Sequence, residues 1–236
     1  MTPDPRALPT SHAPAAIPGA TGDPAVVRRA LDEGRAVVLP NPAPLTCVVT
    51  ATRPAAVNTA KGRPDDQAVA LWAHHPDTLH RLAGLLDLGP AEFGAARRLL
   101  GEHLVTLLVP LRQPGGAPDW LAPATRGGWT LLFGARPRPL VPLLDTFPLL
   151  YVSSANRTGH PPAPTPEAAV GMFGPGVTVL VGTDEPSPTR PEERRATTTV
   201  RLHPDGRLEL HRHGAQDHAF ADPGAYLAHL REVCRG

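Results

Sequence analysis

Apolar residues recur along this chain in two patterns that alternate with each other. Short apolar runs of strand length predict β-strands at residues 36–39, 45–50, 69–73, 104–111, 129–133, 149–152, 177–181, 197–202 and 207–210. Between them, apolar residues repeat every three or four positions and predict helices at residues 23–34, 54–60, 76–88, 90–101, 139–147, 165–173 and 222–234. Because strands and helices interleave, the sequence predicts an α/β fold with a mixed sheet.

The two ends of the chain differ in composition from its middle. Residues 1–22 are rich in Pro and Ala and carry few large apolar side chains, so they predict a disordered or loosely attached arm. They contain no apolar stretch of the kind that secretory signals need. We expect one folded domain over residues 23–216 and a C-terminal helix, within residues 217–236, that packs on the same domain.

Composition narrows the class of protein. The chain has 236 residues, 41% of them hydrophobic, which is enough for a sizeable core, and a formal net charge of +1. That charge provides no global attraction for nucleic acid, so any basic surface is local. The two cysteines, Cys47 and Cys234, form neither a disulfide framework nor a CxxC metal site. No apolar run of about 18 residues is present, so we expect a cytoplasmic protein without a membrane partner.

A lone lysine is the first candidate for chemistry. Among 23 Lys and Arg residues only Lys61 is a lysine, and it opens the segment Lys61-Gly62-Arg63-Pro64. Two cations two residues apart, with a glycine that lets the backbone approach, can clamp an anion such as a polyphosphate. The alternative interpretation is a solvated basic turn.

Small polar side chains follow one predicted strand directly. Ser153, Ser154 and Asn156 come after the apolar run at 149–152, where hydroxyls and an amide are well placed to bind polar atoms of a ligand. The alternative is a capped turn. The GxSxG nucleophile elbow, the P-loop, GxGxxG and HExxH are all absent from the sequence.

The predicted C-terminal hairpin is flanked by threonines and histidines. The run 197–199 is all threonine, which is also ordinary strand sequence. His211 and His213 share one strand face and, with His203, have the residue types of a metal site. Since histidines scattered among arginines are more often surface residues, we predict no metal site.

Taken in order, these segments resemble the YrdC/TsaC family, the threonylcarbamoyl-adenylate synthases of tRNA modification. The resemblance covers roughly residues 24–216 and includes a Lys-x-Arg-Pro motif at 61–64 and a Ser-Ala-Asn-x-Ser/Thr-Gly-x-Pro motif at 154–161. A Ser/Thr-Thr-Val strand at 198–200 and an Arg-x-Gly at 212–214 complete it. Either of the first two motifs is weak alone, whereas both in this order with the hairpin are fairly specific.

The resemblance implies a YrdC-like twisted mixed β-sheet with flanking helices around a concave, positively lined cavity. Such proteins condense L-threonine, bicarbonate and ATP, with Mg²⁺ as a candidate companion of the nucleotide, into threonylcarbamoyl-AMP and pyrophosphate. Carried over, Lys61 and Arg63 are the catalytic pair that holds the ATP phosphates. The remaining residues carried over to the nucleotide and the cavity are Thr106, Ser153, Ser154, Asn156, Arg136, Thr198 and Arg212.

The sequence also departs from the family pattern. Where the family reads Pro-Thr-Asp/Glu-Thr-x-Tyr-Gly-Leu, residues 40–47 read Pro-Asn-Pro-Ala-Pro-Leu-Thr-Cys, and Arg136 is displaced by two positions from the usual Val-Arg-x-Pro. The phosphate half of the site is therefore partly kept and the amine half rewritten. Three functions remain open: synthesis of threonylcarbamoyl-AMP, the same chemistry on another amine, and binding of nucleotide, tRNA or double-stranded RNA without catalysis. RNA binding would rest on arginine pairs such as Arg97-Arg98 or Arg194-Arg195.

Overall fold

The computed structural model describes residues 18–182 and 187–235 of the chain. Its strands are β1 (Ala20–Thr21), β2 (Val37–Leu39), β3 (Val48–Ala51), β4 (Ala70–Trp72), β5 (Thr106–Pro110), β6 (Thr125–Arg126), β7 (Trp129–Phe133), β8 (Tyr151–Ser154), β9 (Thr178–Leu180), β10 (Thr199–Leu202) and β11 (Leu208–Arg212). Its α-helices are α1 (Pro24–Asp32), α2 (Pro54–Lys61), α3 (Pro76–Ala83), α4 (Pro90–Gly101), α5 (Val141–Leu144), α6 (Pro166–Phe173) and α7 (Pro223–Arg235). None of the described helices is long and apolar enough to cross a membrane.

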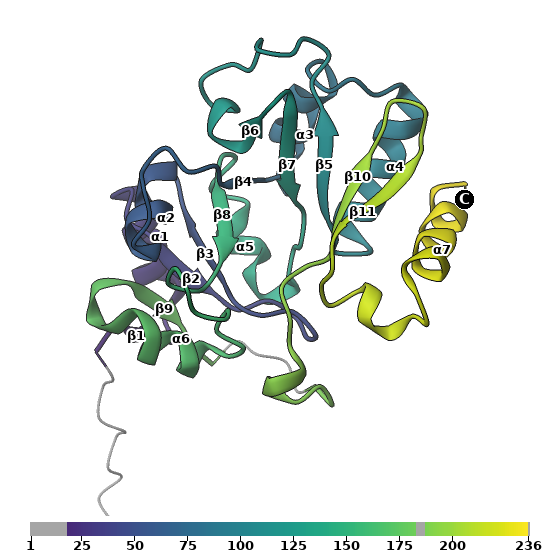
Figure 1. The fold of residues 1–236 in the computed structure, drawn as a ribbon. Coiled ribbons are helices and arrows are strands. Elements are labelled where there is room, and N and C mark those ends of the chain that lie inside the picture. The colour runs from purple at the N-terminus through teal and green to yellow at the C-terminus, as the bar shows by residue number, and fades with distance from the viewer. Residues whose placement is uncertain (1–17, 183–186, 236) are drawn as a thin grey trace, which may run out of the picture.

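All the strands join one mixed sheet, in which β6 pairs with β7 beside the main path (Figure 1). The order along the path is β1-β9-β2-β3-β8-β4-β7-β5-β10-β11. Neighbouring strands are parallel at β1–β9, β2–β9, β4–β7 and β5–β10 and antiparallel at the other pairings. The twisted mixed α/β sheet that the sequence predicted is therefore confirmed.

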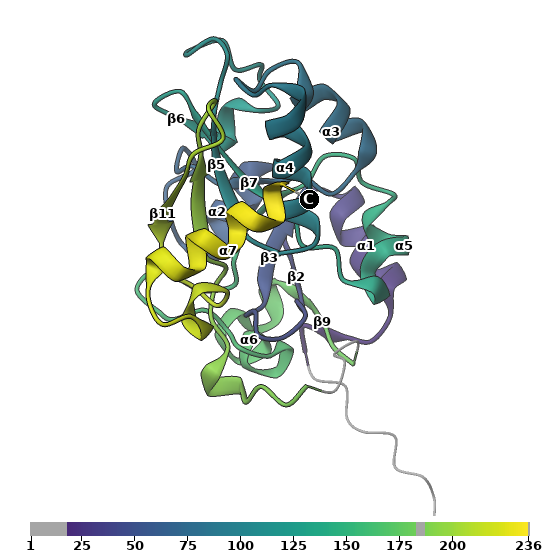
Figure 2. The same cartoon turned by 90° about the vertical axis from the view of Figure 1, so that its right-hand side faces the viewer.

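The two faces of this sheet carry unequal cover. Side chains alternate between faces along each strand, so Val38 enters one core cluster while Val37 and Leu39 enter the other. The first cluster also includes residues of α2, α3, α4, α6 and α7, whereas the second includes residues of only α1 and α5 among the α-helices. Figure 2 shows α7 in front of α4, on the side of the molecule that carries the C-terminus. The smaller cover leaves room for a cavity on the second face.

Proline positions explain where most helices begin. Six of the seven α-helices, all except α5, start with a proline. The first helical residue has no intrahelical partner for its N–H, so proline costs nothing there and its fixed φ suits the helix. Asp23 adds a side-chain cap, because its Oδ1 accepts from the Ala25 N–H at 2.8 Å. This use of proline accounts for part of the high count of 31.

Three boundaries differ from the sequence prediction. α3 ends at Ala83 rather than continuing to residue 88, because Leu86 leaves the helix to form a β-bridge with Leu111. The helix predicted at 139–147 shortens to α5 after a 3₁₀ turn at Arg138–Leu140.

The third difference lies at the N-terminal end. Ala20 and Thr21, part of the predicted arm at 1–22, form β1 beside β9, where the Val181 N–H donates to the Thr21 carbonyl at 2.9 Å. Residues 1–17 of that arm lie outside the described residues. At the other end α7 packs against α4 and β11, and Arg98 Nη2 donates to the Cys234 carbonyl at 2.7 Å.

The unequal cover of the two sheet faces predicts that neighbouring residues of β5 contribute different amounts to stability. Leu107 is fully buried in the large core, whereas Leu108 on the opposite face is only partly buried. Leu107→Ala should lower the free energy of unfolding by about 2–5 kcal/mol, and Leu108→Ala by clearly less. Denaturant unfolding of both variants measures this difference, and equal losses would contradict the assignment of faces.

Candidate functional site

A small cavity lies on the less covered face of the sheet. We call it the sheet cavity; its volume is about 230 Å³, and apolar side chains including Val48, Leu131 and Phe133 form part of its wall. Its polar lining residues are Asn41, Thr46, Arg63, Thr106, Ser153, Ser154, Thr197 and Arg212. Five of the nine site residues predicted from the sequence thus meet here. Two arginines and no carboxylate line the cavity, so its charge favours an anion.

The C-terminal end of α2 positions the Arg63 side chain so that it can bind such an anion. Gly62 ends the helix in the left-handed conformation, with φ of 65°, and thereby turns the chain toward the cavity. Arg63 Nε donates to Asn58 Oδ1 at 2.6 Å, and Asn58 is fully buried and anchored in turn by two backbone carbonyls. The buried Nη2 of Arg63 has no hydrogen-bond partner in the described structure. Burial lowers the pKa of Arg63, and a bound anion would offset that cost.

Arg212 approaches the same cavity from the end of β11. Its Nη2 donates to the Thr197 carbonyl at 3.2 Å, and the residue as a whole stays exposed. The remaining N–H groups of its guanidinium are available to a ligand at the cavity mouth. Arg63 and Arg212 therefore present donors from two segments that lie about 150 positions apart in the sequence.

Lys61 does not line the sheet cavity; it lies behind the wall that Ser154 forms. Its side chain is 4% exposed, and Nζ donates to the Ser154 carbonyl at 2.5 Å and to Asn156 Oδ1 at 2.7 Å. Asn156 also accepts from Ser154 Oγ at 2.7 Å, so it too faces Lys61 rather than the cavity. Burial, and then the charge of Arg63, lower the pKa of Lys61 to about 7.

The threonine run divides between two sides of the chain, in the extended segment that leads into β10 at Thr199. Thr197 lines the sheet cavity, and its hydroxyl lies 2.5 Å from that of Thr106. Thr198 is fully buried on the opposite face, where its Oγ1 donates to Asp217 Oδ1 at 2.6 Å. The sequence interpretation placed Thr198 over the phosphate side and did not select Thr197. Alternation along this extended segment reverses that choice.

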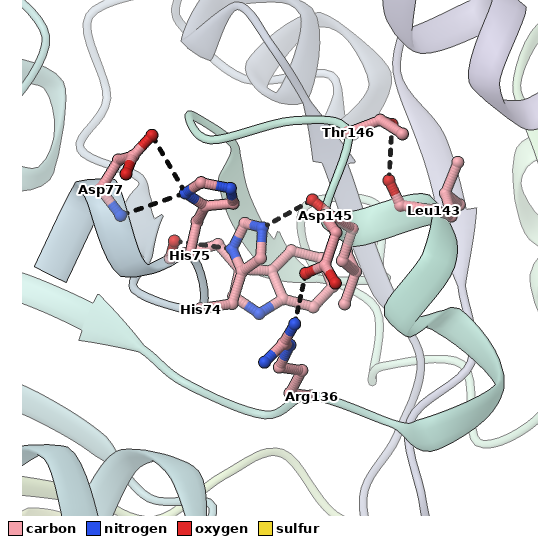
Figure 3. A network of polar contacts seen from close by, with 9 residues as sticks. His74, His75, Asp77, Arg136, Leu143, Asp145 and Thr146 are labelled. Carbon is pink, nitrogen blue, oxygen red and sulfur yellow. Dashed lines mark hydrogen bonds and ion pairs between the residues drawn. The ribbon is translucent and has the colours of Figure 1, made fainter.

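Arg136 belongs to a second cavity, which we call the arginine cavity. It is about 430 Å³ in volume and is lined among others by Asn41, Glu102, Arg136, Arg138 and Arg194. Arg136 forms an ion pair with Asp145 (Figure 3). The structure therefore places Arg136 apart from Arg63 and Arg212, in a neighbouring cavity.

The same network holds the buried ring of His74 between two backbone carbonyls. Its ring nitrogens lie 2.9 Å from the Trp72 carbonyl and 3.1 Å from the Leu144 carbonyl. Burial lowers the pKa of His74 although both carbonyl contacts oppose this effect. The ring thus fixes the turn after β4 to the end of α5, beside the Arg136–Asp145 pair.

Asn41 is a site residue that the sequence interpretation missed. It is 5% exposed and lines both the sheet cavity and the arginine cavity. Its Nδ2 donates to the Thr46 carbonyl at 2.9 Å, while Oδ1 is buried without a hydrogen-bond partner among residues 18–182 and 187–235. That oxygen can accept from an N–H or O–H group of a ligand. The only signal in the sequence is an amide in a segment otherwise rich in proline and apolar residues.

The histidines near the hairpin do not form one cluster. His203 contacts Glu209 and Arg207, whereas His213 contacts Asp217. Within the described part of the chain, no group of three or more His, Cys, Asp or Glu side chains is arranged to hold a metal ion.

No family model and no curated protein matches the sequence. Solved structures do match the fold. Sua5 from P. abyssi, complexed with L-threonine, aligns with a TM-score of 0.58 at 19% identity, over 81% of this chain and 54% of Sua5. YciO from E. coli aligns with a TM-score of 0.58 at 12% identity, over 83% of this chain and 92% of YciO.

The chain has a Sua5/YrdC-like fold. Full-length HypF in its phosphate- and nucleotide-bound form shares it, with a TM-score of 0.56 at 14% identity over 82% of this chain and 24% of HypF. The chain spans about half the length of the Sua5 structures that it matches. The Sua5/YrdC-like fold agrees with the resemblance found in the sequence motifs. The identities are low, so it establishes the fold alone.

The single lysine permits a direct test of its buried position. In protein grown with isotope-labelled lysine, the side-chain signal of Lys61 should titrate near pH 7, about three units below an exposed lysine. Arg63→Gln should raise this pKa, because removal of a like charge favours the ammonium form, but burial should keep it below the ordinary value. NMR titration of both proteins measures the shift. A signal that titrates near pH 10 would place Lys61 in solvent.

Proposed function

We propose that this protein is an ATP-dependent enzyme that condenses an amine and bicarbonate with the nucleotide to form a carbamoyl-adenylate and pyrophosphate. L-threonine is the first amine to test, and the product would serve tRNA threonylcarbamoyladenosine modification. The observation that carries the proposal is the sheet cavity, where Arg63 and Arg212 converge without a neighbouring carboxylate. The Sua5 structure complexed with L-threonine and the HypF structure with phosphate and nucleotide support it as relatives in fold.

The proposed reaction suits these residues. The amine and bicarbonate combine to a carbamate with loss of water; a carbamate oxygen then attacks the α-phosphorus of ATP, and pyrophosphate leaves. This chemistry needs neutralised phosphate charge and aligned reactants rather than a nucleophile supplied by the protein. Arg63 and Arg212 would neutralise the phosphates, and the hydroxyls of Ser153 and Ser154 would position them.

Lys61 would act from behind the wall. Its ammonium lies on the carbonyl of Ser154 and the amide of Asn156, so it holds the end of β8 against the end of α2. Once it is protonated, Lys61 also adds positive charge next to Arg63, which strengthens the attraction for phosphate. Mg²⁺ would arrive on the ATP phosphates, since among residues 18–182 and 187–235 only one carboxylate, Glu102, lines the sheet and arginine cavities.

A second candidate function is binding of nucleotide or structured RNA without catalysis. It is favoured by the engagement of Lys61 with protein acceptors, which leaves fewer of its N–H groups for a phosphate. The rewritten segment 40–47 points in the same direction. Both candidates allow nucleotide binding, but only the first predicts a product.

Product analysis separates the two functions. Protein incubated with ATP, bicarbonate, L-threonine and Mg²⁺ should form threonylcarbamoyl-AMP and pyrophosphate, and Arg212→Gln should lower kcat/KM at least about a hundredfold. Because Arg212 is exposed, this variant should fold. Arg207→Gln, an exposed arginine of the same hairpin outside the sheet cavity, is the matched control and should leave the rate unchanged. ATP binding without product for any of a panel of amines would favour the binding protein.

ATP binding should be linked to proton uptake. At pH 8 a Lys61 with a pKa of about 7 is largely neutral, and a polyphosphate nearby raises that pKa, so the lysine takes up a proton. Calorimetry in buffers of different ionisation enthalpy measures the number of protons. Lys61→Met should bind ATP without this uptake. Uptake of equal size in Lys61→Met would assign the proton to another group.

A further inference from the structure

A third cavity lies on the other side of the chain segment that leads into β10. We call it the histidine cavity; its volume is about 730 Å³, and its lining includes Arg194, Arg195, His213, His218 and several prolines. Thr46 and Ala196 line both the histidine cavity and the sheet cavity, and Arg194 lines both the histidine cavity and the arginine cavity. The three cavities therefore adjoin one another.

The feature that distinguishes the histidine cavity is an imidazole oriented by a buried carboxylate. Nδ1 of His213 lies 2.6 Å from Oδ2 of Asp217. The Asp217 side chain is 7% exposed, whereas that of His213 is 73% exposed. Burial would raise the pKa of Asp217, but hydrogen bonds from Thr198, His213 and the Gly214 N–H outweigh it and lower the pKa.

An ionised carboxylate can only accept, so Nδ1 of His213 carries a proton and the tautomer is fixed. Nε2 is then the nitrogen left for a ligand. In the protonated ring Nε2 donates a charge-assisted hydrogen bond to a bound anion.

The geometry of this pair is built into the fold. Oδ1 of Asp217 accepts from Thr198 Oγ1 at 2.6 Å and from the Gly214 N–H at 2.7 Å. A Cβ atom on Gly214 would lie 2.2 Å from the Thr198 nitrogen, so only glycine permits this close approach. The carboxylate that orients His213 is thus held by Thr198, just before β10, on one side and by the turn after β11 on the other.

The arginines of the cavity add positive charge beside His213. Arg194 is held by a bond from Nη1 to the Pro164 carbonyl at 3.1 Å, and its buried Nε has no partner within the described residues. Arg195 is exposed. Two acidic residues, Glu192 and Asp217, also line the cavity, and Asp217 is already committed to His213 and Thr198. The cations therefore outnumber the free carboxylate.

We propose that the histidine cavity binds the phosphate group of a small molecule, with the imidazolium of His213 and the guanidinium of Arg195 as its donors. This site is separate from the sheet cavity, because Arg212 and His213 are neighbours that line different cavities. The proposal does not depend on the carbamoyl-adenylate reaction. It requires only a phosphate anion and the pair of His213 and Asp217.

Inorganic phosphate is the probe, and the imidazole signals in NMR spectra are the readout. The signal of His213, assigned by its loss in His213→Asn, should shift saturably as phosphate is added. His213→Asn keeps a donor near Asp217 but removes Nε2, and His213 is exposed, so the variant should fold. Calorimetry should show phosphate affinity reduced at least about tenfold in His213→Asn and in Arg195→Gln.

Two controls localise the effect. His211→Asn changes an exposed histidine of the same hairpin that lines none of the three cavities, and it should leave phosphate affinity unchanged. Arg63→Gln weakens the sheet cavity, and the His213 signal should still shift in it. A shift that does not saturate, equal affinity in His213→Asn, or loss of the shift in Arg63→Gln would each overturn the proposal.

Discussion

The unequal cover of the two sheet faces is the constraint on which the site depends. Five helices pack on one face and bury it completely enough to form the large core, while α1 and α5 shield only part of the other. On that second face Phe133 of β7 belongs to the smaller core and Leu131 packs against it, and both also form part of the cavity wall. The strands that line the cavity therefore also form the core, so the floor of the cavity is held rigidly.

The basic residues around the sheet cavity have different roles. Arg63 and Arg212 present N–H groups to the sheet cavity, while Lys61 stays behind the wall and ties two chain ends together. A guanidinium could not replace Lys61 easily, because a compact ammonium fits between one carbonyl and one amide oxygen in a buried space. This offers a physical reason why the one lysine of the chain stands here, where arginine serves at every other basic position.

The order of strands and helices was predictable because apolar periodicity records which side chains face the core. The family motifs and the small hydroxyls after one strand pointed to five residues that line the sheet cavity: Arg63, Thr106, Ser153, Ser154 and Arg212. The placement of the other candidate residues could not be predicted, because it depends on contacts between parts of the chain that are distant in sequence. Thr197 and Thr198 are chemically identical neighbours, and only the conformation of the segment that leads into β10 decides which one faces the cavity. Arg136 was assigned to the anion because it lies two positions from the arginine of the family motif, and its ion pair with Asp145 is recognised only in three dimensions.

The positions of Arg212, His213 and Gly214 limit which insertions and deletions this region can accept. Arg212 serves one cavity and His213 the next, and the glycine immediately after them is wedged against the backbone of Thr198. A one-residue insertion or deletion in the hairpin would exchange the sides on which arginine and histidine emerge and would drive a side chain into the wedge. Among relatives, insertions and deletions should therefore be confined to the loop at 204–206. At the end of β11 residue types should vary while the number of residues before the glycine stays constant.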